Sequence, residues 1–472
     1  MRGHRHAITG ADVPSLPRRP RLVRMPLALS LLGGLGLALC FPPFDAPWPL
    51  LPISLASWLH GIQGRAFREA ALHTLGFGLA FQFVLLRWAI VIGTDAWLAL
   101  ALVEAVFLLP LGLAAARVQR PLALVPLLAI GLPATDWVRD HAGVLAFGWG
   151  QLAFASLDAP WVRLAPSAGQ WAVTGCAAAT GAAIVALIRG RATVRVLAAG
   201  TLVLLLTVPL LLPTALPTRW SADTIALVQG GADHLGVGVQ DPRAVLRRHA
   251  ALTVRSLAGT AAHLVVWPEN AVDVDPMRDA AAREILLRTS ADIGRPLLIG
   301  AIVDVATGRT NAMVRVERGT MTTTYVKQRL VPFGEYLPMR DLFTRVFERA
   351  ALIPVDFVPG PDPGAVSVAG RRMGLLICFE IADEALARAA VEPGASALLL
   401  QTNNATYAGT GQGEQQLRIA QFRAIELGVP VYVVSTTGPS AVISANGRIM
   451  QTLRDGATGV LLAPLPAHRV PV

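Results

Sequence analysis

The sequence contains a single lysine, Lys327, and every other long basic side chain is an arginine. A bulk preference for arginine removes lysine wherever a solvated positive charge is enough, so the remaining lysine is expected where arginine fails. Arginine is a broad, planar and always charged fork, whereas lysine is a compact charge with an adjustable pKa. Lys327 is therefore a candidate for a confined catalytic pocket, and the alternative is chance survival.

Charged residues are also scarce. They make up 15% of the chain, against 53% hydrophobic residues, which argues against an ordinary soluble protein. The apolar excess lies before about Pro213, and the remainder has ordinary globular composition. We therefore predict a basic N-terminal segment (1–24), a multi-span α-helical membrane domain (25–216) and a second, extracytoplasmic domain (217–472).

Cysteine is rare too, with three in the chain. Cys40 and Cys176 lie inside apolar segments, which leaves Cys378 alone in the second domain and argues against a disulfide framework. A lone cysteine in a domain that faces an oxidising compartment suggests a functional thiol. The alternative is an inert buried cysteine, which behaves as a small apolar side chain.

Several apolar segments reach the roughly 20 residues that a helix needs to cross a bilayer. The first has the cationic lead of a signal peptide, but we expect it to be retained because six more follow. The predicted segments lie near residues 25–42, 47–62, 72–93, 96–116, 121–135, 166–188 and 195–213.

The charges between these segments predict their orientation. Arginines gather in the N-terminal segment and in the loops after the second, fourth and sixth segments, whereas the other loops hold aspartates. This alternation places the N-terminus in the cytoplasm and everything after about Leu216 outside, where ATP-dependent chemistry is not expected. The same loops account for much of the net charge of +10, so no nucleic-acid partner is predicted.

The segment from Asp136 to Pro160 is too polar to span, and it is rich in aromatic residues that suit a bilayer interface. We predict an outer loop, re-entrant or not, that lies under the second domain. An ordinary surface loop is the alternative.

From Ala222 onward, short β-rich runs alternate with helical patterns, and continuous apolar runs imply strands buried on both faces. A layered α/β sandwich is therefore expected. Between strands, the insertion Glu335–Gly360 has the spacing of a short amphipathic helix around Leu342–Phe347, either a lipid-facing lid or a helix packed on its own domain. Predicted strands are Thr224–Gln229, Leu264–Trp267, Leu297–Val303, Ala312–Val316, Met373–Ile377, Ala397–Gln401 and Val431–Ser435, and predicted helices are Ala244–Leu257, Asp279–Ala291, Ile381–Ala390 and Gln415–Leu427.

Three chemically distinct side chains each end an apolar run. Glu269 follows one run, Lys327 a second and Cys378 a third, and active-site groups gather at such strand ends. A thiol must lose its proton to attack, so a carboxylate base beside it is required. The ammonium can stabilise both the thiolate and a tetrahedral oxyanion.

The order Trp267–Glu269, Lys327 and Cys378–Glu380 resembles the nitrilase superfamily of carbon–nitrogen hydrolases. The stretch Val326–Tyr336, preceded by a multi-span half, is similar to bacterial apolipoprotein N-acyltransferases. Further segments similar to this family are Val228–Gly230, Gly308–Asn311, Arg423–Glu426 and Thr437–Ser440.

This resemblance implies a nitrilase-like αββα sandwich with Glu269, Lys327 and Cys378 as catalytic triad. It also implies that Glu335 positions the triad and that Glu380 is an acidic residue after the nucleophile. Phe379 stands where tyrosine is common in the family, a change that leaves the backbone N–H unaffected. Asn311 is expected to hydrogen-bond near the site.

The implied reaction is a ping-pong acyl transfer at the bacterial inner membrane, on its periplasmic side. Cys378 attacks an ester carbonyl of a phospholipid acyl donor and takes the acyl chain as a thioester. The chain expected is the sn-1 chain of phosphatidylethanolamine. The α-amino group of a diacylglyceryl apolipoprotein then accepts the chain. The thioester retains the acyl energy, so no cofactor and no metal is implied.

Some positions depart from the family pattern. Gly231–His234 replaces a usual Asn-Ile-Pro, and Asn404–Tyr407 replaces the usual Asp-Ala-Trp-Phe. The family usually ends in another membrane helix, whereas Val460–Pro464 is too short to span, so the C-terminus is expected outside. Two other hypotheses stay open: a membrane-tethered nitrilase-type amidase acting on a small amide, and a non-catalytic membrane scaffold.

Overall fold

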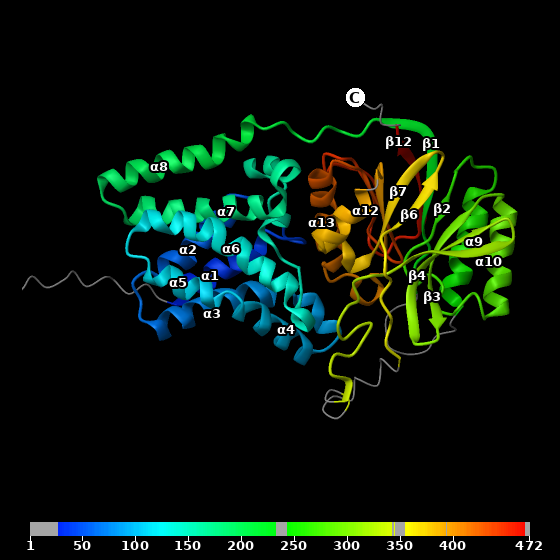
Figure 1. Ribbon diagram of the computed structural model, residues 1–472, viewed down its shortest axis with the longest axis horizontal. Coiled ribbons are helices and arrows are strands. Elements are labelled where there is room, and N and C mark those ends of the chain that lie inside the picture. Colours follow the sequence, from blue (N-terminus) through cyan, green and yellow to red (C-terminus); the bar gives the residue numbers. More distant parts are fainter. Residues whose placement is uncertain (1–26, 233–242, 342–343, 345–354, 393, 468–472) are drawn as a thin grey trace, which may run out of the picture.

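The computed structural model describes residues 27–232, 243–341, 344, 355–392 and 394–467. An α-helical region comes first and an α/β region follows, and the two pack side by side with helices α12 and α13 between them (Figure 1). The predicted amphipathic helix around Leu342–Phe347 lies outside the described residues.

Each predicted apolar segment overlaps a helix. The fourth segment overlaps two, because the helix is interrupted between Val106 and Leu109, just before Pro110. Within the residues that the structure describes, four helical stretches, 94–117, 121–141, 160–189 and 192–211, are long and apolar enough to cross a membrane. The helices are α1 (Leu27–Leu39), α2 (Leu50–Ile62), α3 (Phe67–Leu85), α4 (Thr94–Val106), α5 (Leu109–Arg117), α6 (Leu124–His141), α7 (Ala165–Arg189) and α8 (Ala192–Thr207).

Helix length limits the prediction of seven crossings. The described helices α1 and α2 have 13 residues each. At about 1.5 Å per residue they cover about 20 Å, against a hydrocarbon core of about 30 Å. Length and composition therefore support four of the seven predicted crossings.

The prediction that a loop begins at Asp136 was wrong, because α6 continues to His141. The helix tolerates its charges because Arg139 pairs with Asp136 at 2.9 Å and with Glu104 of α4 at 2.7 Å. The following residues include two short 3₁₀ turns, 143–145 and 152–155, and Trp149 between them is buried. This part does lie against the α/β region, as predicted.

The α/β region contains two six-stranded sheets, with strand orders β12-β1-β2-β3-β4-β5 and β11-β10-β9-β8-β7-β6. The strands β1-β2-β3 and β7-β8-β9 pair in parallel, and the outer strands pair antiparallel. The strands are β1 (Trp220–Gln229), β2 (Val265–Val266), β3 (Leu297–Val305), β4 (Gly308–Glu317), β5 (Thr320–Val326), β6 (Gly364–Val368), β7 (Arg371–Ile377), β8 (Ala397–Thr402), β9 (Val431–Ser435), β10 (Ser440–Ile443), β11 (Ile449–Leu453) and β12 (Gly459–Pro466).

The layers are those of an αββα sandwich. Apolar side chains such as Val266, Leu375 and Tyr432 fill the space between the sheets. Helices α9 (Ala244–Leu257) and α10 (Ala280–Ile293) cover the first sheet, and α12 (Glu384–Val391) and α13 (Gln412–Leu427) cover the second. One apolar core continues from the helical region into α13, so the second sheet is held against the membrane helices.

Most predicted elements of the α/β region are present with similar bounds. The predicted helix Ile381–Ala390 is shorter, because residues 378–382 form a 3₁₀ turn and the Asp383 side chain caps α12 by accepting from the Leu386 N–H. Five strands, β5, β6, β10, β11 and β12, were not among the predicted strands, although Lys327 was expected to follow the apolar run that ends β5. β6, β10 and β11 are short, and β5 holds polar residues on an exposed face, which weakens their pattern. β12 contains Pro464 and Pro466, which argue against a strand in the sequence.

Candidate active site

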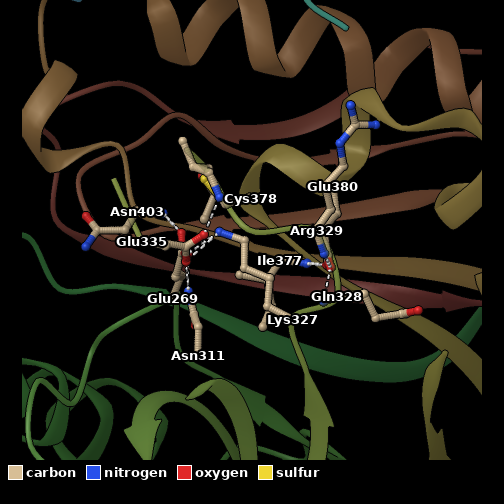
Figure 2. A network of polar contacts seen from close by, with 12 residues as sticks. Glu269, Asn311, Lys327, Gln328, Arg329, Glu335, Ile377, Cys378, Glu380 and Asn403 are labelled. Carbon is tan, nitrogen blue, oxygen red and sulfur yellow. Dashed lines mark hydrogen bonds and ion pairs between the residues drawn. The ribbon is translucent and has the colours of Figure 1, made fainter. Parts of the chain in front are cut away.

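Glu269, Lys327 and Cys378 come from three strands that end at the same side of the sandwich. Glu269 follows β2, Lys327 follows β5 and Cys378 follows β7 directly. Figure 2 shows the Lys327 side chain reaching toward Glu269, with Cys378 beside them. The fold therefore brings together the three groups that the sequence placed at strand ends.

Two carboxylates share the single lysine. Lys327 Nζ lies 3.3 Å from Glu269 Oε1 and 2.9 Å from Glu335 Oε1 (Figure 2). The Lys327 side chain is almost fully enclosed, with its residue 1% exposed. Burial acts to lower the pKa of this ammonium, but the carboxylates of Glu335 and Glu269 outweigh it and hold that pKa well above its usual value. The lysine is therefore charged.

Other donors fix the two carboxylates. Asn311 Nδ2 donates to Glu269 Oε1 at 2.7 Å and to Glu335 Oε1 at 2.9 Å. The remaining Glu269 oxygen accepts from the Asn403 N–H at 2.8 Å, and that of Glu335 accepts from the Val331 N–H at 2.8 Å. Each carboxylate oxygen is thus held in one position by the chain.

Cys378 has a backbone φ of 53°, in the left-handed region that non-glycine residues rarely adopt. Such strained residues cluster at functional sites. Burial, followed by the charge of Glu269, raises the pKa of the Cys378 thiol to about 12, while Lys327 acts to lower it. The resting thiol is consequently neutral at pH 7, and attack requires a base.

Glu380 points away from the sulfur and joins the turn after β7 to the loop after β5. Its carboxylate accepts from the backbone N–H groups of Ile377 (2.7 Å), Gln328 (2.6 Å) and Arg329 (3.1 Å), and from the Tyr325 hydroxyl. Burial raises the pKa of Glu380, and the backbone donors counteract it. Its position fits a residue that holds the strand ends of Lys327 and Cys378 in register.

Phe379 joins the site to the helical region. Its ring stacks on Phe147 and Trp149, with centroid distances of 5.4 and 6.0 Å. The guanidinium of Arg329 lies over the same ring at 5.5 Å and pairs with Asp140 of α6 at 2.9 Å. The turn that carries Cys378 therefore rests on the rings of Phe147 and Trp149, which precede Phe379 by more than 200 positions in the sequence.

Several side chains around the site had no place in the sequence prediction. Thr402 Oγ1 and Gln416 Nε2 each lie 3.6 Å from the Cys378 sulfur. The rule that singled out Glu269, Lys327 and Cys378, a polar residue after an apolar strand, applies equally to Thr402 and Asn403. Gln416 lies inside a helix, and no local pattern marks it.

Two family models match this chain, one in each of its two regions. The family model described as "Apolipoprotein N-acyltransferase N-terminal domain" matches residues 33–183, and the one described as "Carbon-nitrogen hydrolase" matches residues 224–471. Among solved structures, an amidase from Nesterenkonia sp. is 24% identical, with a TM-score of 0.41, and the match covers 53% of this chain and 93% of that chain.

Curated relatives match over most of the chain. The apolipoprotein N-acyltransferase of Mycolicibacterium smegmatis is 31% identical over 459 residues, which cover 89% of this chain and 77% of the relative. That of Pseudomonas syringae pv. tomato is 30% identical, and the match covers 94% of this chain and 91% of the relative. With both family models matched in the expected order, this chain belongs to the apolipoprotein N-acyltransferase family.

Proposed function

We propose that this chain moves a fatty acyl chain from a phospholipid to the N-terminal amine of a diacylglyceryl-cysteine in a lipoprotein. Glu269, Lys327 and Cys378 form the catalytic triad, and Glu335, Asn311, Phe379 and Glu380 support it. The observation that carries this proposal is the meeting of a carboxylate, an ammonium and a thiol beside helices long enough to cross a membrane.

In the first half-reaction, Glu269 takes the proton of the Cys378 thiol and the sulfur attacks the ester carbonyl carbon of the phospholipid. Lys327 and the backbone N–H groups of the turn after Cys378 stabilise the oxyanion. The ester C–O bond then breaks, and Glu269 gives its proton to the departing oxygen. Lysophospholipid leaves, and Cys378 carries the acyl chain as a thioester.

In the second half-reaction, the free amine of the diacylglyceryl-cysteine attacks the thioester carbonyl and passes its proton to Glu269. The C–S bond breaks, an amide forms, and the sulfur recovers its proton from Glu269. The thioester must be shielded from water between the two steps. The stacked rings of Phe147, Trp149 and Phe379 supply an apolar wall beside the nucleophile.

Both substrates are anchored in lipid, so the site must open near a leaflet. The loop after Lys327 exposes the apolar side chains of Phe333 and Met339, which suits contact with lipid. The arginine pattern of the helical region supports the periplasmic side of the inner membrane. Two reporter enzymes fused after Val472 test this placement. We expect activity from the reporter that works only outside the cytoplasm, and activity from a reporter that works only in the cytoplasm would contradict the proposal.

The acyl adduct tests the reaction itself. The purified full chain is incubated with phosphatidylethanolamine, and the peptide that contains Cys378 is analysed by mass spectrometry. We expect a mass increase of one fatty acyl group, which disappears when a diacylglyceryl-cysteine peptide is added and reappears as N-acylated peptide. Cys378→Ala should give neither product.

The amidase alternative makes the opposite prediction. If Cys378 stays unmodified by phospholipid while the chain hydrolyses a small amide, the acyltransferase proposal is wrong. If Cys378→Ala restores growth to cells that lack their own enzyme, the scaffold hypothesis is favoured instead.

A further inference from the structure

The hydrogen bonds around the Cys378 sulfur involve residues that the triad mechanism does not use. In the part of the chain that the structure describes, two side chains contact the sulfur within hydrogen-bonding distance, Thr402 and Gln416, each at 3.6 Å. Thr402 ends β8, and Gln416 is in the second turn of α13. Both are buried.

The single hydroxyl proton of Thr402 decides which of the two serves the sulfur. Thr402 Oγ1 lies 2.7 Å from Gln416 Oε1 and 2.9 Å from Asn404 Oδ1, both much closer than the sulfur. A hydroxyl has one proton to donate, and an amide oxygen at these distances is the better acceptor. The shorter of the two contacts assigns that proton to Gln416 Oε1, and the sulfur is left to Gln416 Nε2.

This arrangement also fixes the orientation of the Gln416 amide. Because Gln416 Oε1 accepts from Thr402, its NH₂ group must face Cys378. An NH₂ group can donate to a thiolate but cannot accept from a thiol. The amide thus favours the ionised sulfur, which is the form that attacks.

The helix that carries Gln416 is held against the membrane helices by the preceding residue. Gln415 Oε1 accepts from the indole N–H groups of Trp88 (3.2 Å) and Trp149 (2.7 Å). Its Nε2 donates to the carbonyl oxygens of Pro42 and Leu85, both at 3.0 Å. All four hydrogen-bonding positions of this amide are used, so Gln415 anchors α13 while Gln416 faces the nucleophile.

We infer that Gln416 is a further catalytic residue of this site, whose amide donates to the Cys378 sulfur and stabilises the thiolate before attack. Thr402 is the residue that positions this amide. The inference rests on the proposed function only in taking Cys378 as the nucleophile. When Glu269 removes the thiol proton, Gln416 donates without breaking a covalent bond, and its interaction weakens once the sulfur becomes a neutral thioester.

Alkylation of Cys378 by iodoacetamide tests this role without acyl transfer. The reagent reacts with the thiolate, so at pH 7 to 9 the rate measures the ionised fraction. Gln416→Glu keeps the oxygen that accepts from Thr402 but replaces the donor by a negative charge. We expect the alkylation rate of the Cys378 peptide to fall at least tenfold across this pH range, and that of Gln416→Met to fall less, by about threefold to tenfold.

A matched control lies on the same helix. Gln421→Glu makes the same change one and a half turns away, where the side chain bonds to the Gly447 carbonyl, and should leave the rate within twofold. Thr402→Ser, which retains the hydroxyl, should also be near normal, whereas Thr402→Val should slow alkylation. Thermal unfolding of each variant identifies those that fail to fold, since unfolding would speed alkylation rather than slow it.

The outcomes separate the two proposals. Unchanged alkylation in both Gln416→Glu and Gln416→Met would overturn the role of Gln416, whatever the acyl adduct experiment gives. An acyl adduct that never forms on unaltered Cys378 would overturn the proposed function, while slow alkylation of Gln416→Glu would still support the hydrogen bond.

Discussion

Two regions of this molecule bury charged side chains, and they hold them differently. In the α/β region, every carboxylate oxygen of Glu269 and Glu335 accepts a hydrogen bond from the chain. In the helical region, Glu104 is buried in an ion pair with Arg139, but its oxygens have no well-directed hydrogen bond within the described residues, and neither has the amide of Gln82.

The difference teaches where geometry matters. A buried ion held by several donors from separate elements has one allowed position, which suits groups that must meet a reacting atom within a fraction of an ångström. An ion pair with a single neighbour lowers the cost of burying a charge, but it does not fix the position of that side chain. Substitutions should therefore affect activity strongly in the first cluster, and affect little more than stability in the second.

The strongest test of this contrast is Lys327→Arg. The charge is kept, but the broad guanidinium cannot fit between Glu269 and Glu335 in a space where the lysine is almost fully enclosed. We expect acyl transfer to fall by about 10³-fold, the scale of losing an oxyanion donor. The transfer rate to a diacylglyceryl-cysteine peptide measures this.

The reverse exchange at the surface is its control. Arg318→Lys alters an exposed residue that lies 4.0 Å from Glu317, and should leave transfer unchanged. Near-normal acyl transfer by Lys327→Arg would show that the pocket accommodates a guanidinium group. The survival of a single lysine in this chain would then say nothing about the site.

A second test removes the shared donor. Asn311→Asp places a third carboxylate against Glu269 and Glu335 in place of an amide that donates to both. Like charges at this distance raise one another's pKa, so the base should be partly protonated at pH 7. We expect a loss of transfer of about 10²-fold, recovered in part at higher pH as the extra proton leaves.

Asn446→Asp is the matched control, because Asn446 accepts from the Arg448 N–H with its side-chain oxygen, which aspartate retains. Full transfer by Asn311→Asp at pH 7 would contradict the view that this cluster depends on donors.

The contrast also marks what sequence could and could not predict. Apolar runs that end in Glu269, Lys327 and Cys378 predicted that these side chains lie at strand ends, since strand direction and burial follow from local patterns. Thr402 and Asn403 fit the same pattern, whereas Gln416 reaches the Cys378 sulfur from inside a helix, 38 positions away in sequence. Such contacts depend on sheet order and helix packing, which no local pattern contains.

Charges in the helical region misled the prediction for a related reason. Asp136 was read as the start of a polar loop, because hydropathy counts a charge as exposed. Arg139, one turn along the same helix, pairs with Asp136, and Glu104 from another helix pairs with Arg139. The helix therefore continues through residues that hydropathy excludes. The pair between Arg139 and Glu104 is visible only once α4 and α6 are packed together.

A third, smaller effect is expected where the two regions meet. Arg329 bonds to Asp140 of α6 at 2.9 Å and to Asp383 at 2.5 Å, and so connects both regions to the loop that holds Lys327. Arg329→Leu leaves the buried Asp140 unpaired, so we expect a loss of about 1–3 kcal/mol in stability and a fall in transfer of about tenfold. Thermal unfolding and transfer rates measure both.

The double variant with Asp140→Asn should lose less than the sum of the single variants, by about 0.5–3 kcal/mol, because the two residues interact directly. Arg418→Leu is the control, since its pair with the exposed Asp45 also joins the two regions and should contribute about 0–1 kcal/mol. Strict additivity for Arg329 and Asp140 would mean that the regions are held together by apolar packing alone.

The smallest expected effect, and the sharpest test of the helical region, is Gln82→Met. Gln82 is 1% exposed, and within the described residues neither atom of its amide has a hydrogen-bond partner. An unpartnered buried amide costs about 1–3 kcal/mol, so a methionine of similar volume should leave stability unchanged or raise it by about 1 kcal/mol, with full transfer. Gln415→Met makes the same exchange at a glutamine with four hydrogen bonds, and should be clearly destabilising.

A cavity of about 20 Å³ lies beside Gln82 and Asp136, which is large enough for one water molecule. If Gln82→Met destabilises the protein as much as Gln415→Met does, an ordered water satisfies this amide, and the helical region holds its polar groups as firmly as the active site does.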